Sequence, residues 1–287
     1  MTGPGSGPGD ATSRLPDLLR PLVAEPGRGA LFLDFDGTLS AVVKDPREAV
    51  PLPGVPALVA ELAVPFALVA VISGRPTAFL EDALGAPPGV TLAGLYGLER
   101  ALRGPAHDTW AAVVDEVVAE ALATAPPGVY VEPKGLTVTL HFRQAPEHKD
   151  WVLGFAERQH ERRGLTVVQG RRERELRPPL DVDKGTVVDA LVAEHDTQAP
   201  GEPLVAAAAF GDDVGDLPAF DALQRLHDAG GPLRTVVRVA AVDAESPPAV
   251  AAAADLTVAG ATGAVTLLHD LAAAAAGAAG AAASAQR

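Results

Sequence analysis

Three apolar runs in this chain each stop abruptly at a cluster of polar residues. The runs span residues 31–33, 66–72 and 204–210, and the clusters are Asp34 to Thr38, Ser73 to Arg75 and Gly211 to Asp216. Such runs are typical of buried strands, and helical patterns lie between them, so the sequence predicts a parallel sheet wrapped by helices. The carboxyl ends of parallel strands meet at one edge, where open α/β sheets bind ligands.

The first cluster places two carboxylates one residue apart. Side chains along a strand repeat with period two, so Asp34 and Asp36 start on the same side of the chain. Two carboxylates this close repel each other unless a cation lies between them. Such a pair alone is also common in turns and at helix caps, so its interpretation depends on the other clusters.

A cation follows much later in the chain. Lys184 lies in the string Asp183-Lys-Gly-Thr186, which opens a helical stretch over 187–195. A cation near a helix N-terminus is well placed to meet an anion. Each piece also has a structural explanation: residues 211–213 as a turn, Ser73 as a helix N-cap and Lys184 as a solvated first-turn residue. Their ordered occurrence on strand and helix ends favours one shared site.

These four motifs, in this order, resemble the haloacid dehalogenase (HAD) phosphohydrolase superfamily. The resemblance implies an α/β fold with a HAD-type, Rossmann-like parallel core. It also implies that Asp34 attacks phosphorus to form an aspartyl-phosphate, and that Asp36 transfers protons to the leaving group and from water. Ser73 and Lys184 would bind the phosphoryl oxygens. The further candidates for substrate binding in the core are Thr38, Gly74 and Arg75.

The same resemblance implies a divalent cation, with Mg²⁺ as the expected ion. Its ligands would be the carboxylates of Asp34 and Asp212 and the main-chain carbonyl of Asp36, with waters and a phosphate oxygen completing six. Asp213 and Asp216 would orient waters or Lys184. The cofactor prediction is therefore Mg²⁺.

The middle of the chain changes character. Helical patterns over 110–123 and 150–163 alternate with two pairs of short strands, 129–132 with 136–142 and 165–169 with 174–177. This order predicts an antiparallel sheet with two helices, inserted into the core as an α+β cap; one continuous domain with an irregular middle is the alternative. The predicted division is a disordered segment 1–13, core 14–105, cap 106–177, core 178–270 and an Ala-rich tail 271–287.

Composition limits the classes of function. The formal net charge of -14 and the pI near 4.8 argue against a nucleic-acid binder, which needs a basic surface. The chain has no cysteine, which excludes disulfides and a thiolate nucleophile and is compatible with a reducing cytosol. Neither a membrane-spanning stretch nor a signal peptide is recognisable. We expect a soluble cytoplasmic protein.

Motifs in the cap narrow the resemblance to the trehalose-6-phosphate phosphatases. They are Val131-Glu-Pro-Lys-Gly-Leu136, Leu140-His-Phe-Arg143 and Glu175-Leu-Arg-Pro178, and Gly94-Leu-Tyr-Gly-Leu-Glu99 in the core agrees with them. The similarity covers roughly residues 31–258. It implies that the cap binds sugar hydroxyls through Glu132, Lys134, Arg143 and Glu175. The chain departs from many relatives at Gly215 and Leu217, which stand in place of a Thr and an acid, and at Tyr96, where several relatives carry a polar residue.

Three functions are consistent with the sequence. The first is hydrolysis of trehalose 6-phosphate in trehalose biosynthesis, with a functional pairing to a trehalose-phosphate synthase. The second is hydrolysis of another sugar phosphate, such as sucrose 6-phosphate or mannosyl-3-phosphoglycerate. The third is a non-catalytic sensor or a regulatory subunit of a synthase. The presence of Asp34, Asp36, Lys184 and Asp212 argues against the third, because a sensor needs no nucleophile paired with an acid.

Overall fold

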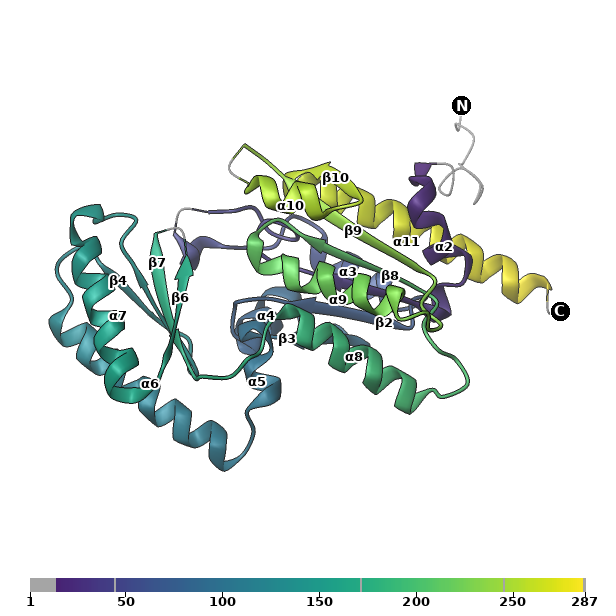
Figure 1. Cartoon of the computed structure of the whole chain (residues 1–287). Coiled ribbons are helices and arrows are strands. Elements are labelled where there is room, and N and C mark those ends of the chain that lie inside the picture. Colours follow the sequence, from purple (N-terminus) through teal and green to yellow (C-terminus); the bar gives the residue numbers. More distant parts are fainter. Residues whose placement is uncertain (1–13, 44, 171, 245, 286–287) are drawn as a thin grey trace.

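The chain forms a parallel sheet flanked by helices and a separate antiparallel sheet with two helices (Figure 1). The structure is a computed structural model, and it describes residues 14–285 except 44, 171 and 245. The predicted disordered segment 1–13 lies outside the described residues. The predicted fold class, an α/β core with an α+β insertion, is confirmed.

The main sheet has six parallel strands in the order β10-β9-β8-β1-β2-β3. Their bounds are β1 Gly29–Leu33, β2 Leu68–Ile72, β3 Val90–Ala93, β8 Ala206–Gly211, β9 Thr235–Val242 and β10 Leu256–Ala259. Leu33 pairs with Val71 on one side and with Phe210 on the other. The register therefore brings the polar residues that follow β1, β2 and β8 to one edge of the sheet.

Helices cover both faces of this sheet because its buried strands are apolar on both sides. Those outside the insertion are α2 Arg20–Ala24, α3 Val55–Leu62, α4 Thr77–Leu84, α5 Leu98–Ala101, α8 Lys184–Gln198, α9 Leu217–Asp228, α10 Pro248–Ala253 and α11 Gly260–Ala285. Leu31 and Leu33 pack toward α2, α3 and α11, whereas Ala30 and Phe32 pack toward α8, α9 and α10. Short 3-10 turns lie at 17–19, 26–28, 46–48, 95–97, 146–148 and 214–216.

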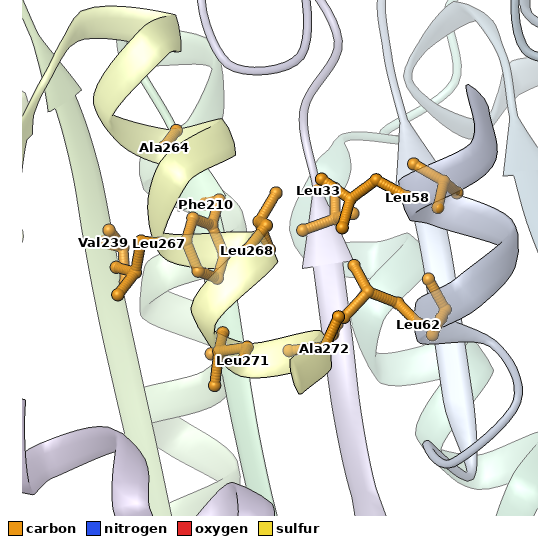
Figure 2. Close-up of a cluster of buried hydrophobic side chains, with 14 of the residues drawn as sticks. Leu33, Leu58, Leu62, Phe210, Val239, Ala264, Leu267, Leu268, Leu271 and Ala272 are labelled. Atoms are coloured by element: carbon orange, nitrogen blue, oxygen red, sulfur yellow. The ribbon is translucent and has the colours of Figure 1, made fainter. Parts of the chain in front are cut away.

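Helix α11 runs through the predicted Ala-rich tail. Its side chains Leu267, Leu268, Leu271 and Ala272 face the sheet residues Phe210, Val239 and Leu33 (Figure 2). Leu271 and Ala272 are buried, so the start of the segment 271–287 contributes to the core of the fold. Alanine favours a helix, and small side chains allow it to lie close to the strands.

The second sheet is antiparallel, with the order β4-β5-β7-β6. Its elements are α6 Pro105–Thr124, β4 Tyr130–Pro133, β5 Val138–His141, α7 Lys149–Arg163, β6 Thr166–Gly170 and β7 Glu173–Arg177. The predicted order of two helices and four strands is confirmed. The first helix begins five residues before the predicted Trp110, because Pro105 occupies its first position after Gly104.

The two faces of this sheet differ in polarity. Val131, Leu140 and Leu176 belong to an apolar cluster with α6 and α7. The alternate residues form two cross-strand rows, Tyr130-His141-Glu173 and Glu132-Thr139-Glu175. Since this core is built entirely from residues 110–176, we propose that 106–177 folds as one inserted unit, the cap. None of the helices in the described part of the chain has the length and hydropathy needed to cross a membrane.

Candidate active site

A buried lysine bridges two carboxylates at the carboxyl edge of the main sheet. Asp34 directly follows β1, Lys184 is the first residue of α8, and Asp216 ends the turn after β8. The Lys184 ammonium donates to Asp34 Oδ1, and to Asp216 Oδ1 at 2.6 Å. Asp216 also accepts from the backbone N–H of Asp212, at 2.8 Å, which fixes its position. All three charged side chains of this bridge are buried.

Asp212 adds a third carboxylate to this place. Carboxylate oxygens of Asp34, Asp212 and Asp216 lie within 4.8 Å of one another. Gly37 makes room for Asp212: its φ is +84°, and a Cβ atom there would lie 2.1 Å from Asp212 Cγ. Gly37 is therefore required for two reasons: the turn needs a positive φ at this position, and the neighbouring loop with Asp212 leaves no room for a side chain.

Burial and mutual repulsion disturb the ionisation of this cluster. Burial raises the pKa of Asp34 to about 7, although Lys184 opposes the change. Burial raises the pKa of Asp212 to about 9, and the charges of Asp34 and Asp216 act in the same direction. One ammonium cannot neutralise three carboxylates, so this set of hard oxygen ligands has the chemistry of a divalent-cation site.

These pKa values predict how stability depends on pH without a metal. The native Asp212 carboxyl keeps its proton up to pH about 9, whereas an unfolded one loses it near 3.8. The native state thus binds more protons between these values, and the free energy of unfolding must fall as pH rises through them. In EDTA, we expect the melting temperature to fall from pH 5 to pH 9.

Asp212→Asn isolates this effect from the general repulsion of an acidic protein. The variant should lose less stability than the wild type over the same pH range, and Mg²⁺ should raise the melting temperature of the wild type more than that of the variant. Parallel pH profiles of the two proteins, with equal responses to Mg²⁺, would contradict this interpretation of Asp212.

The loop after β2 brings a guanidinium to the second carboxylate. Arg75 donates to both oxygens of Asp36, at 2.7 and 2.9 Å. The Arg75 backbone N–H donates to the hydroxyl of buried Ser73, at 3.2 Å. Nearby in the first loop, Thr38 is fully buried and its hydroxyl finds no partner among the described residues. A buried hydroxyl without a partner suggests that a bound ligand supplies one.

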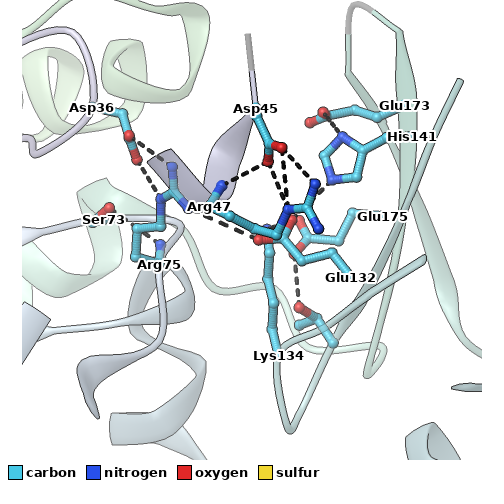
Figure 3. A network of polar contacts seen from close by, with 11 residues as sticks. Asp36, Asp45, Arg47, Ser73, Arg75, Glu132, Lys134, His141, Glu173 and Glu175 are labelled. Carbon is cyan, nitrogen blue, oxygen red and sulfur yellow. Dashed lines mark hydrogen bonds and ion pairs between the residues drawn. The ribbon is translucent and has the colours of Figure 1, made fainter. Parts of the chain in front are cut away.

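A chain of ionic contacts connects this loop to the cap (Figure 3). Arg75 lies 3.9 Å from Glu132, which also contacts Lys134 at 3.4 Å and His141 Nε2 at 2.8 Å. His141 Nδ1 in turn lies 3.0 Å from Glu173. Burial lowers the pKa of His141, but the two carboxylates outweigh burial and raise it overall, which favours an imidazolium that donates to both.

A cavity of about 350 Å³ lies at the far end of this chain of contacts. Its lining includes His141, Glu173, Tyr130 and Arg143 from the cap and Arg47 from the loop after β1. The Arg47 guanidinium lies over the Tyr130 ring, 4.9 Å from its centroid. Arg143 is exposed and makes no hydrogen bond or ion pair within the described part of the chain, so its donors are available to a ligand.

The structure divides the predicted site residues into groups. Asp34, Lys184, Asp212 and Asp216 meet in the core, and Asp36, Ser73, Gly74 and Arg75 lie in neighbouring loops. The cap presents Glu132 to Arg75, and Lys134 pairs with Glu132. Buried Glu175 accepts from the Thr137 hydroxyl at 2.8 Å. Arg143 faces the separate cavity, and exposed Asp213 accepts from the Val214 N–H without contacting Lys184.

His141, Arg47 and Tyr130 were absent from the predicted set, and Asp216 has a larger part than predicted. His141 joins two carboxylates, and its signal was the period-two alternation of polar residues in β4, β5 and β7. Asp216 was expected only to orient waters or Lys184, yet it also belongs to the cluster of three carboxylates. Arg47 and Tyr130 meet across the boundary between core and cap, which no local pattern indicates.

The chain is similar to known proteins in sequence and in fold. A family model described as trehalose-phosphatase matches residues 32–254. A trehalose-phosphate phosphatase of Mycobacterium marinum is 38% identical in an alignment of 224 positions that covers 74% of this chain and 56% of that protein. The chain thus spans little more than half the length of this curated relative.

Solved structures share the fold. The C-terminal domain of C. albicans trehalose-6-phosphate phosphatase has a TM-score of 0.68 at 23% identity, covering 90% of this chain and 98% of that one. A haloacid dehalogenase-like hydrolase from Bacteroides thetaiotaomicron has a TM-score of 0.54 at 14% identity, covering 84% and 98%. At these identities the similarity shows the fold alone, and that fold is HAD-like.

Proposed function

The chain belongs to the trehalose-phosphatase family, and from this premise we propose that it hydrolyses trehalose 6-phosphate to trehalose and phosphate. One observation carries the proposal. Buried Asp34 is held by Lys184 at the carboxyl edge of the sheet, and Arg75 in a neighbouring loop contacts Glu132 on the polar face of the cap. Phosphate release from trehalose 6-phosphate and from a panel of other sugar phosphates tests it. A synthase that makes trehalose 6-phosphate would supply the substrate, and the cytoplasm is the proposed location.

In the proposed mechanism Asp34 is the nucleophile. Its carboxylate attacks phosphorus, the P–O ester bond breaks, and the sugar leaves as an alkoxide that takes a proton from Asp36. A water then attacks the aspartyl-phosphate while Asp36 removes its proton, which regenerates Asp34 and releases phosphate. Since Arg75 holds both oxygens of Asp36, we propose that the phosphoryl group draws Arg75 away before Asp36 carries a proton.

The carboxylate cluster fits a magnesium ion. Asp34, Asp212 and the main-chain carbonyl of Asp36 would hold it, and Asp216 would keep Lys184 in place. When bound, the ion would neutralise negative charge on the phosphoryl group. Lys184, Ser73, Thr38 and the N–H groups at Gly74 and Arg75 would bind the phosphoryl oxygens.

We propose that the sugar extends from the phosphoryl group along the polar face of the cap. Glu132, Lys134 and Glu175 would bind hydroxyls, and Arg143 at the cavity would bind the ring far from the phosphate. A pair of opposite charges such as Glu132 and Lys134 is well adapted to binding a neutral polyol. The two charges balance each other, and both side chains can still form hydrogen bonds to sugar hydroxyls.

Arg143→Ala tests the distal part of this site. Because the Arg143 donors are otherwise unused, its loss should lower kcat/KM for trehalose 6-phosphate by about 10- to 100-fold, as expected for one charge-assisted hydrogen bond. Hydrolysis of para-nitrophenyl phosphate, which has no sugar, should change by less than about threefold.

Arg162→Ala is the matched control. Arg162 is largely exposed and pairs with Glu120 on the helical side of the cap, at 3.2 Å. Its removal should therefore leave the hydrolysis of both substrates unchanged. If Arg143→Ala lowered kcat/KM for both substrates equally, Arg143 would act on folding or on the core chemistry. The proposal that it binds the sugar would then be wrong.

A further inference from the structure

One sequence motif, Gly94 to Glu99, has no role in the mechanism above, yet its backbone is highly constrained. Leu95, Tyr96 and Gly97 are consecutive residues with φ of +49°, +55° and +95°. Only glycine adopts this left-handed conformation freely, so Leu95 and Tyr96 are strained. Strain of this kind persists where the surrounding structure enforces it, and it is often found at functional sites.

The surroundings do enforce it. The N–H groups of Leu95 and Tyr96 donate to the carbonyls of Arg75 and Ser73, both at 2.9 Å. On the other side Gly97 packs against α8, where a Cβ atom would lie 2.3 Å from Val187 Cγ2. The turn is therefore fixed between the phosphate-binding loop after β2 and the helix that carries Lys184.

This turn directs the Tyr96 side chain over the active site. A Cβ atom on Gly74 would lie 2.6 Å from the Tyr96 hydroxyl, and one on Gly215 would lie 3.7 Å from its Cε1. The Lys184 ammonium lies 6.0 Å from the ring centroid. The ring thus spans from the loop after β2 to the loop after β8, next to Lys184.

The hydroxyl is available to a ligand. It has no hydrogen-bond partner among residues 14–285 as described, and the side chain is only partly buried. Burial raises the pKa of Tyr96, and the Glu175 carboxylate of the cap raises it further, more than Lys184 lowers it. The phenol therefore remains a hydrogen-bond donor and lies within electrostatic reach of both the core lysine and the cap.

An apolar ring would fill the same space without a free donor, so the hydroxyl needs its own explanation. We propose that Tyr96 is a specificity-determining residue whose hydroxyl donates a hydrogen bond to the sugar ring that carries the phosphate. The phosphoryl oxygens already have Lys184 and the loop N–H groups as partners, whereas the phenol hydroxyl lies over Gly74, where the charge of the cap residue Glu175 still reaches it. The inference rests on the proposed function only in requiring a sugar phosphate.

Tyr96→Phe keeps the ring and removes the donor. We expect kcat/KM for trehalose 6-phosphate to fall by about 3- to 10-fold, as for one neutral hydrogen bond, and kcat/KM for para-nitrophenyl phosphate to fall by less than twofold. A melting temperature equal to that of the wild type would show that the substitution leaves the fold intact. The discriminating quantity is the ratio of the two losses.

The outcomes separate this inference from the proposed function. If the wild type prefers another sugar phosphate, the trehalose assignment fails, and the same comparison is made with that substrate. Equal losses on the sugar phosphate and on para-nitrophenyl phosphate, or no loss on either, would overturn the role of Tyr96 alone. Activity on para-nitrophenyl phosphate but on no sugar phosphate would overturn both.

Discussion

Replacing Asp34 by Asn is expected to reduce turnover of trehalose 6-phosphate by several powers of ten. The amide is nearly isosteric but is a poor nucleophile, so the variant should fold and bind substrate while the first step fails. The loss corresponds to a barrier increase on the order of 5 kcal/mol or more. Phosphate release by rigorously purified protein measures it, and mass spectrometry of quenched wild-type reactions should detect a phosphoryl group on Asp34.

The matched control for this substitution is Asp189→Asn. Asp189 lies on α8 and pairs with Arg225 at the surface, at 3.0 Å. Its amide variant should retain wild-type activity, because an exposed ion pair contributes little. A tenth of wild-type activity in the Asp34 variant would mean that Asp34 is not the nucleophile.

Removing divalent cations should also abolish activity. The three carboxylates of Asp34, Asp212 and Asp216 face one ammonium, an arrangement whose repulsion a cation would relieve. Activity should disappear in excess EDTA and return with Mg²⁺, and Asp212→Ala should raise the concentration of Mg²⁺ required. Calcium should inhibit, because its larger and looser coordination favours bidentate ligation of Asp34, which hinders in-line attack.

Full activity in EDTA, after dialysis that removes bound metal, would contradict the assignment of the carboxylate cluster. If Asp212→Ala needed no more Mg²⁺ than the wild type, Asp212 would not be a ligand of the ion. Both measurements use the same phosphate-release assay as the Asp34 variant.

The sequence predicted the core of the fold because its signals are local. Runs such as Phe66–Ile72 and Leu204–Phe210 are apolar on both faces and end at polar clusters, which is the pattern of buried parallel strands. Parallel pairing then fixes one common edge, so the sequence alone was enough to group Asp34, Ser73 and Asp212. The order β4-β5-β7-β6 had no such signal, because strand neighbours depend on how the cap packs.

The parts of the site that sequence did not predict are those that depend on side chains far apart in the chain meeting in space. The pairing of Arg75 with Asp36 joins residues 39 positions apart, and Arg47 meets Tyr130 across the boundary between core and cap. The left-handed backbone at Tyr96 is likewise invisible in sequence, because nothing marks a tyrosine for positive φ. Tertiary packing decides such positions.

The most direct test of the account is the specificity constant of the purified chain, with Mg²⁺, for trehalose 6-phosphate against a panel of sugar phosphates. The panel should include sucrose 6-phosphate and mannosyl-3-phosphoglycerate, the alternatives that the motifs left open. We predict that kcat/KM for trehalose 6-phosphate exceeds that for every other member by at least about tenfold, because a site of paired charges penalises sugars that leave them without hydrogen bonds. A higher value for another sugar phosphate, or no release from trehalose 6-phosphate, would contradict the proposed function.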